Sequence, residues 1–194
     1  EELIAKGREI KWHPEFMRQR FESWTENLKW DWLVSRQRYF GVPVPFWYSK
    51  RKGEEGKILV PTLDQLPVNP LTTPPTGYTM DEVEPDMDVM DTWATSSITP
   101  QMNARAIAKG FALDEARAAK LFPADMRPQS HEIIRTWAFY TIAKALLHSD
   151  TVPFHNAAIS GWILAADHTK MSKSKGNGVP PDVLLKDHGA DVVR

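Results

Sequence analysis

Apolar residues near the start of the chain repeat with the spacing of an α-helix. Pro is favoured at the first position of a helix, so Pro14 is expected to begin one that reaches about Leu28. The apolar residues near one face of this helix are Phe16, Phe21, Trp24 and Leu28, with Arg18, Arg20 and Glu22 off that face. The segment is therefore expected to pack on a core through a face rich in aromatic residues.

Three further segments have helical patterns. Ser130 can cap a long helix that reaches Leu147, and apolar residues occupy nearly every side of it, so this helix should be deeply packed. Residues 101–121 are rich in Ala with scattered charges and are predicted to be mostly helical, although Gly110 weakens the prediction. A final helical region is expected to begin at Pro181.

Three short segments have the character of strands. Residues 31–35 (DWLVS) and 156–164 (NAAISGWIL) are predicted to be buried strands, and residues 88–95 a strand that runs into a loop. Strand, helix, strand, loop and helix follow one another in this order. That order favours an α/β layer architecture with parallel strands.

Proline is concentrated in one part of the chain. Of the fifteen prolines, eight lie between Pro43 and Pro85. Because proline lacks a backbone N–H, this density opposes long helices and central strands. Residues 46–86 are therefore predicted to form an irregular, partly extended insertion.

Composition narrows the possible classes of protein. The 194 residues suit one domain or the larger part of one, and the net charge of −1 gives no argument for nucleic acid. The absence of cysteine excludes disulfides and fits a reducing, cytoplasmic compartment. We predict no metal site and no membrane-spanning helix, because the histidines lack paired spacing and the apolar runs are short. The start without Met leads us to expect an excised fragment.

One polar loop carries most of the candidate chemistry. Lys170, Lys173 and Lys175 lie within six residues, and no acidic residue occurs between Asp167 and Asp182. Lysine ammonium groups act as point charges for phosphate, while serine hydroxyls and backbone N–H groups add donors. On chemistry alone, a phosphate-binding loop and an ordinary solvated lysine-rich loop explain these residues equally well.

The amino-acid sequence of this loop, residues 168–178, resembles a known signature. Residues 170–174 read KMSKS, the signature of class I aminoacyl-tRNA synthetases, and Lys-Gly-Asn follows as in the valine, isoleucine and leucine branches. The other segments that resemble this family, most closely its valine branch, are residues 32–38 (WLVSRQR) with 41–45 (GVPVP), 88–97 (DVMDTWATSS), 133–137 (IIRTW) and 189–191 (GAD) with Arg194. The resemblance implies that residues 1–194 are the C-terminal half of a catalytic domain, part of a Rossmann-like nucleotide-binding fold.

The resemblance also implies how the loop would act on ATP. Lys170 and Lys173 would neutralise the triphosphate while its α-phosphorus is attacked, with Lys173 contributing most. Ser172 and Ser174 would contact phosphate oxygens, although simple turn chemistry explains these two serines about as well. Mg²⁺ is expected to accompany ATP, and the sequence shows no protein ligands for it.

Other residues match positions around the nucleoside. Glu132 would accept a hydrogen bond from a ribose hydroxyl of ATP, and Ser130 would lie close to that ribose. A helix N-terminus with a serine cap explains both residues equally well. Gly161, Trp162 and Ile163 would form the wall beside the adenine. A plain buried strand is the competing interpretation of these three residues.

The resemblance places an amino-acid pocket between aromatic walls. Trp93 and Trp137 would flank the aliphatic side chain of the substrate, and Ile133 would narrow the space to fit valine. The alternative for all three residues is ordinary core. Arg36 and Gln37 are either structural hydrogen-bonding residues or contacts to the tRNA acceptor end.

The implied reaction is activation of valine by ATP to valyl-adenylate, followed by transfer to tRNA. The family's second ATP signature, a His-x-Gly-His run, does not occur in the chain, so the isolated chain is expected to be inactive. Alternatives are an isoleucyl or leucyl relative, a non-catalytic phosphate- or RNA-binding module, and a purely structural fragment with an exposed sheet edge.

Overall fold

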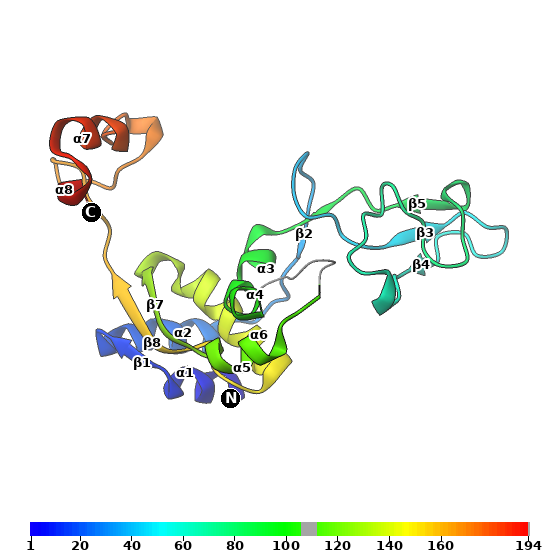
Figure 1. Cartoon of the computed structure of the whole chain (residues 1–194), viewed down its shortest axis with the longest axis horizontal. Coiled ribbons are helices and arrows are strands. Elements are labelled where there is room, and N and C mark those ends of the chain that lie inside the picture. The colour runs from blue at the N-terminus through cyan, green and yellow to red at the C-terminus, as the bar shows by residue number, and fades with distance from the viewer. Residues whose placement is uncertain (106–111, 194) are drawn as a thin grey trace.

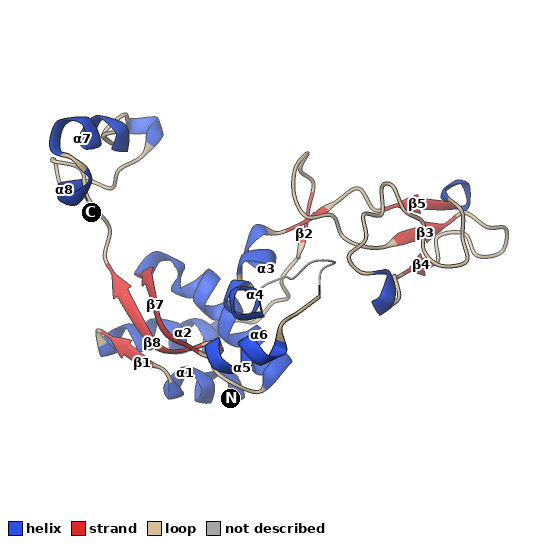
Figure 2. Cartoon of the chain, viewed as in Figure 1, coloured by secondary structure: helices blue, strands red, loops and turns tan. Residues whose placement is uncertain are grey.

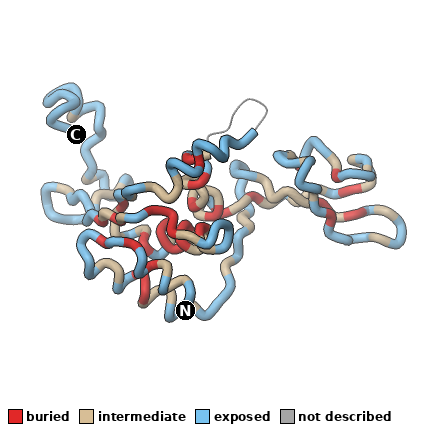
Figure 3. Tube along the Cα trace, turned by 60° about the horizontal axis from the view of Figure 1, so that its bottom comes forward, coloured by how far each residue is buried: buried red, intermediate tan, exposed pale blue. Residues whose placement is uncertain are grey.

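The computed structural model describes residues 1–105 and 112–193. It has an α/β body, an insertion of short strands, and a C-terminal arm that carries two helices (Figure 1). Figure 2 shows that the longer helices and the longest strands both belong to the body. Buried residues also concentrate in the body, whereas the C-terminal arm is exposed along its length (Figure 3).

A three-stranded parallel sheet lies at the centre of the body. Its strands are β1 (Lys11–His13), β8 (Phe154–Ser160) and β7 (Ala124–Ser130), in the spatial order β1-β8-β7. The α/β class with parallel strands is thereby confirmed. The sheet is joined to helices α1 (Glu2–Glu9), α2 (Arg18–Asn27) and α6 (Phe139–Ser149) by one buried apolar cluster.

The predicted helix behind Pro14 is present with a different burial pattern. A 3-10 turn, η1 (Glu15–Met17), leads into α2, where Phe21 is fully buried. Phe16 is 70% exposed, so it was wrongly assigned to the packed face. Glu22 is buried instead, because Arg8 and Arg18 both form ion pairs with its carboxylate.

The second predicted helix is confirmed, and it is composite. Ser130 caps its start, since the hydroxyl oxygen accepts a hydrogen bond from the Glu132 N–H at 3.3 Å. A 3-10 turn, η5 (His131–Ile133), and a π-helical turn, η6 (Ile134–Ala138), precede α6. Ile134 and Ile142 are fully buried, as the apolar pattern predicted.

The strand predictions were only partly right. Residues 31–34 have no regular structure, and the nearest strand is β2 (Ser35–Arg36), which pairs antiparallel with β6 (Val89–Met90). After β6 the chain forms helix α3 (Thr92–Ser96) rather than a loop, because the Asp91 carboxylate caps it. The predicted strand 156–164 ends at Ser160, and residues 161–164 are exposed.

The described part of the Ala-rich region contains two short helices. They are α4 (Thr99–Arg105) and α5 (Glu115–Leu121). Residues 106–111, with Gly110 among them, lie outside the described residues, so the prediction of a mostly helical segment is not tested there.

The Pro-rich insertion contains a small sheet of its own. Strands β3 (Trp47–Ser49), β4 (Ile58–Leu59) and β5 (Val83–Pro85) pair antiparallel in the order β4-β3-β5, with 3-10 turns η2 (Leu63–Gln65) and η3 (Met80–Glu82). Trp47 is fully buried, and its indole N–H donates to the Pro70 carbonyl at 3.0 Å. The insertion is mostly irregular, as predicted, and has a separate core.

The C-terminal arm begins where β8 ends. It contains the 3-10 turn η7 (Lys173–Lys175) and helices α7 (Pro181–His188), which begins at Pro181 as predicted, and α8 (Ala190–Val193). No residue from 161 to 193 is buried. In the described part of the chain, no helix is long and apolar enough to cross a membrane.

Candidate active site

The carboxyl ends of β7 and β8 meet at one edge of the sheet. Ser130 and Ser160, the last residues of these strands, are register partners. In open parallel sheets, ligands bind beyond this edge. The residues that follow the two strands, from His131 and from Gly161 onward, therefore share one location although they lie about thirty positions apart.

Three predicted ATP-binding side chains meet at this edge. The Lys170 ammonium donates to Glu132 Oε1 at 2.6 Å, and the Trp162 indole N–H donates to Glu132 Oε2 at 3.0 Å. Lys170 Nζ also lies 4.8 Å from the centroid of the Trp162 ring. These contacts connect the end of β7, the segment after β8 and the start of the lysine-rich loop.

The electrostatics of Glu132 follow from these contacts. The hydrogen bond from Lys170, followed by that from Trp162, lowers the pKa of the Glu132 carboxyl. Both carboxylate oxygens accept a hydrogen bond, so the ionised form of Glu132 is favoured and its carboxylate is oriented. Of the other residues predicted here, Ser130 is half-buried as the cap, Gly161 is exposed, and Ile163 is 80% exposed.

The KMSKS loop is shaped by its own polar residues. Ser172 Oγ accepts from the Lys175 N–H at 3.2 Å and lies 2.8 Å from Ser174 Oγ. The Asn177 side chain accepts from the Ser172 N–H at 2.9 Å and donates to the Lys170 carbonyl at 3.2 Å. The serines act in the structure as turn residues, which was one of the two alternatives. The role of Asn177 in holding the loop was missed, although asparagine in a Gly-containing turn is a known signal.

Lys173 lies in this loop with an exposed side chain. A cavity of about 500 Å³ adjoins it, lined by Met171, Gly176 and neighbouring residues of the loop and of the start of α7. Lys173 thus differs from Lys170, which contacts the body through Glu132.

The three residues predicted to form the amino-acid pocket lie together on α3, η5 and η6. The Trp137 indole N–H donates to the Ser96 carbonyl at 3.0 Å, and Trp137 is only 4% exposed. Trp93 and Ile133 are half-buried and pack against the same apolar cluster. Trp137 stacks on Phe154 with ring centroids 6.1 Å apart, so it stands in the structure as a core residue.

Arg36 has structural contacts. One guanidinium nitrogen forms an ion pair with Asp91 Oδ2, and another donates to the carbonyl of Ser35 at 2.7 Å. Asp91 is 7% exposed, and its Oδ1 accepts from the Trp93 N–H at 2.7 Å. Arg36 therefore holds the Asp91 carboxylate in place, and that carboxylate caps α3 and binds the backbone N–H of Trp93. Sequence reasoning missed Asp91, although an acidic residue directly before a helical segment is a capping signal.

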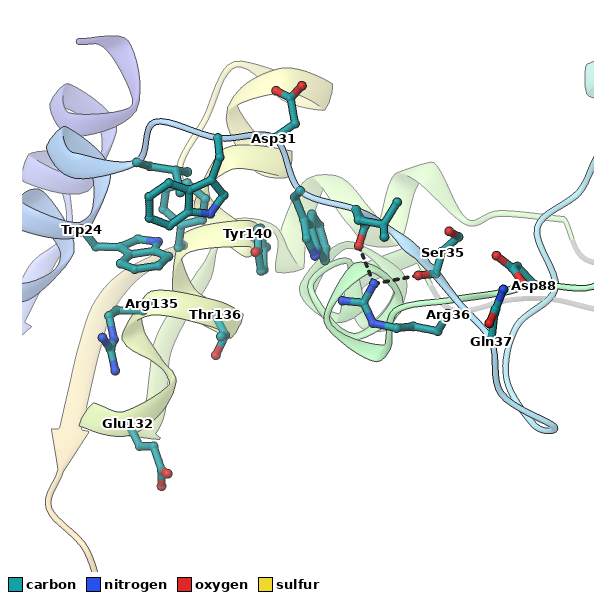
Figure 4. A pocket seen from close by; sticks show the side chains of 15 residues that line it. Trp24, Asp31, Ser35, Arg36, Gln37, Asp88, Glu132, Arg135, Thr136 and Tyr140 are labelled. Carbon is teal, nitrogen blue, oxygen red and sulfur yellow. Dashed lines mark hydrogen bonds between the residues drawn. The ribbon is translucent and has the colours of Figure 1, made fainter.

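A cavity of about 1110 Å³ lies beside this site. Trp32 and Tyr140 stack in its wall with centroids 3.8 Å apart, and Trp24 and Phe139 meet edge to face at 6.5 Å. Figure 4 shows Arg36 and Gln37 on the strand side of the cavity, and Glu132, Arg135 and Thr136 along the turns that lead into α6. Glu132 is the one predicted ATP-binding residue in its lining, while Trp93, Ile133 and Trp137 are not part of it.

The part of the chain that the structure describes contains no cluster of three or more His, Cys, Asp or Glu side chains placed to hold a metal ion. At the candidate site the acidic group is Glu132, whose oxygens are already occupied by Lys170 and Trp162.

Comparison with known proteins identifies the family. The family described as tRNA synthetases class I (I, L, M and V) matches residues 1–194. Proteins named valine–tRNA ligase from Rickettsia rickettsii (strain Sheila Smith) and Rickettsia prowazekii (strain Madrid E) are 59% and 57% identical over the whole chain. The chain spans 24% of the length of these relatives.

A solved structure gives the same result for the fold. The ternary complex of Agrobacterium radiobacter K84 agnB2 LeuRS with tRNA and LeuAMS superposes with a TM-score of 0.67 and 26% sequence identity. The superposition covers 86% of this chain and 24% of that protein. It supports the Rossmann-like α/β fold inferred from the sequence.

The matched segment lies in the N-terminal region of these relatives and not in their C-terminal half. The narrower prediction, that it forms the C-terminal half of the catalytic domain, stays a prediction. Because the family match extends over residues 1–194, the chain belongs to the class I tRNA synthetases of the isoleucine, leucine, methionine and valine group.

Proposed function

We propose that this chain is part of an enzyme that activates valine with ATP and transfers it to tRNA. The observation that carries the proposal is the convergence of Lys170, Glu132 and Trp162 beyond the carboxyl ends of β7 and β8. A cation, an acceptor for hydroxyl groups and an aromatic face are the groups that a nucleotide needs at such an edge. The names of the curated relatives support valine and tRNA as the other substrates.

In the proposed reaction, a carboxylate oxygen of valine attacks the α-phosphorus of ATP and pyrophosphate leaves. Lys170 and Lys173 would offset the negative charge that builds up on the phosphate oxygens, and Glu132 would accept a hydrogen bond from the ribose. A ribose hydroxyl at the 3′ end of tRNA then attacks the valyl carbonyl, and AMP leaves. Mg²⁺ would enter with the triphosphate and neutralise part of its charge.

Selection of valine is assigned to Trp93, Ile133 and Trp137. Their side chains share one apolar cluster, and α3 is fixed to η6 by the bond from Trp137 to Ser96. In this proposal, the half-buried faces of Trp93 and Ile133 contact the substrate, and Trp137 supports them from the core. Gln37, which is exposed beside the 1110 Å³ cavity, stays a candidate contact for the tRNA acceptor end. The proposed compartment is the cytoplasm.

The test is a chimera, because the chain spans a quarter of its relatives. Residues 1–194 would replace the matching segment of the valine–tRNA ligase of Rickettsia prowazekii, and valine-dependent ATP–pyrophosphate exchange would be measured. We expect activity, and we expect Lys173→Ala to lower kcat by roughly 100- to 1,000-fold, because a positioned charge contributes about that much in a transition state.

The control is Lys175→Ala, a change of the same charge two positions away. A soluble chimera that binds tRNA in a salt-dependent manner but exchanges no pyrophosphate would favour the non-catalytic alternative. Equal exchange with valine and isoleucine would contradict the assignment of valine to this pocket.

A further inference from the structure

A second polar cavity lies away from the candidate active site. It has a volume of about 300 Å³, is open to solvent, and is lined by residues of helices α4 and α5 and of strands β7 and β8, with Ala124 and Phe154 at the starts of these strands. The residues that line it are Thr99, Pro100, Asn103, Ala104, Arg117, Leu121, Ala124, Met126, Arg127 and Phe154. Two of them are arginines and none is acidic, so the lining carries a net positive charge.

Arg127 is the unusual member of this lining. Its guanidinium carbon lies 3.9 Å from the centroid of the Trp137 ring, so one face of the guanidinium is covered. Its Nε is buried and has no hydrogen-bond partner. Burial lowers the pKa of Arg127, although arginine keeps its charge at physiological pH. Buried donors without a partner are rare in native proteins and call for an explanation.

No carboxylate in the described residues neutralises this charge. Neither Arg127 nor Arg117 takes part in an ion pair within residues 1–105 and 112–193. Nearby on α4 and α5, Arg105 does have an acidic partner in Glu115, at 3.2 Å. The cavity thus keeps two guanidinium groups free in a region where another arginine is paired.

We infer that this cavity binds an oxyanion, a phosphate or carboxylate group attached to a small apolar body. Arginine presents parallel donors that match the oxygens of these groups. Asn103 adds a side-chain amide that makes no hydrogen bond in the described structure, and Leu121, Ala124 and Phe154 supply the apolar wall. The cavity is at the lower end of the size range of small-molecule sites. This inference goes beyond the proposed reaction, which takes place at the opposite ends of β7 and β8.

The experiment uses phenyl phosphate, which joins a dianion to a small apolar ring, with phenol as the uncharged control. Both would be titrated into the ¹⁵N-labelled 194-residue chain at pH 7.5 and constant ionic strength, with NMR of side-chain N–H groups. We expect saturable shifts of the Arg127 Nε–H and of the Asn103 amide with phenyl phosphate and none with phenol. Shifts confined to Gly176 and Gly178 would overturn the inference, because they would place the phosphate on the KMSKS loop.

A second test uses variants that leave Arg127 unchanged, because replacing Arg127 would disturb the packing of Trp137. Arg117 is exposed, so Arg117→Gln should leave the fold intact. Loss of one charge-assisted contact should weaken the apparent affinity about tenfold. Arg38→Gln, which removes an exposed arginine far along the chain from the lining, is the matched control. Equal affinity in the two variants would overturn the inference.

Discussion

Glu132 joins three segments of the chain through two hydrogen bonds to its carboxylate. Lys170 and Glu132 are both proposed to contact ATP, yet in the structure they bind each other. A nucleotide would therefore have to separate this pair before it could bind both residues. The contact holds the start of the loop at the edge of the sheet, and Trp162 orients the carboxylate that makes it.

The change Trp162→Phe tests this role. It removes the indole N–H and keeps an aromatic ring beside Lys170. We expect the KMSKS loop to open more often, and trypsin to cut after Lys173 and Lys175 about threefold faster, since an exposed polar contact contributes little energy. Trp30→Phe is the control, because Trp30 is 67% exposed. Unchanged cleavage in Trp162→Phe would show that the loop is held in another way.

Arg36 supports a second prediction at this scale. Arg36→Met leaves the buried Asp91 carboxylate without its cation, and the change should lower the free energy of unfolding by about 1–3 kcal/mol. Urea unfolding monitored by near-ultraviolet circular dichroism would measure it. Arg38→Met, at an exposed arginine whose side chain makes no hydrogen bond or ion pair in the described structure, should change stability by less than about 0.5 kcal/mol. Equal effects would contradict the structural role of Arg36.

Single residues were predictable where their role is local. Ser130 was identified as a cap from its position before an apolar run, and the structure has that hydrogen bond. The burial of Glu22 and of Asp91 could not be predicted in the same way. Their burial depends on Arg8, Arg18 and Arg36, whose approach is set by tertiary structure.

At the scale of elements, the Pro-rich insertion contains an ion pair between Arg51 and Glu82, and the titration of Glu82 can be measured. Arg51 binds both oxygens of Glu82 at 2.8 Å, and the Thr79 N–H donates to Glu82 at 3.0 Å. These bonds, that of Arg51 first, lower the pKa of Glu82 from 4.5 to about 2. Since the ionised form is favoured in the folded state, the contribution of Glu82 to stability is complete above about pH 4.5 and is lost as the pH falls through 2.

Carboxyl ¹³C NMR would test this titration. Glu82 should titrate near 2 in the unmodified chain and at a higher pH in Arg51→Gln, where the bond from the Thr79 N–H still keeps its pKa below the ordinary value. Lys57→Gln is the control, because Lys57 forms an ion pair with Glu54 instead. A Glu82 titration near 4.5 in the unmodified chain would show that the pair with Arg51 does not persist in solution.

Elements differ in how far the sequence could predict them. Proline density correctly indicated an irregular insertion, but strands of two or three residues leave no periodic signal, so β3, β4 and β5 were not foreseen. β1 is equally short, and β7 contains polar residues and Pro128, which argue against a strand. β7 forms because β8 pairs with it in parallel, and that partner lies thirty positions away along the chain.

For the whole molecule, family membership was predictable because it rests on short sequence signatures such as KMSKS rather than on packing. The position of the amino-acid pocket stays a prediction, because Trp137 is covered in the structure while an aromatic cavity lies next to it. Residues 161–193 are nowhere buried, so their amides should exchange with deuterium much faster than those of β8. Comparable protection in the two segments, measured by mass spectrometry, would show that the arm packs on the body in solution.

The exposed arm also leads to a prediction about activity. The KMSKS loop is joined to the body through Lys170 and Glu132, while Lys173 makes no contact there. The second ATP signature of the family does not occur in the 194 residues. In the proposed reaction both signatures act on ATP, and these residues contain one of the two. We expect the isolated chain to show no valine-dependent ATP–pyrophosphate exchange above background, whereas the chimera exchanges. Measurable exchange by the isolated chain would mean that residues 1–194 contain a complete adenylation site.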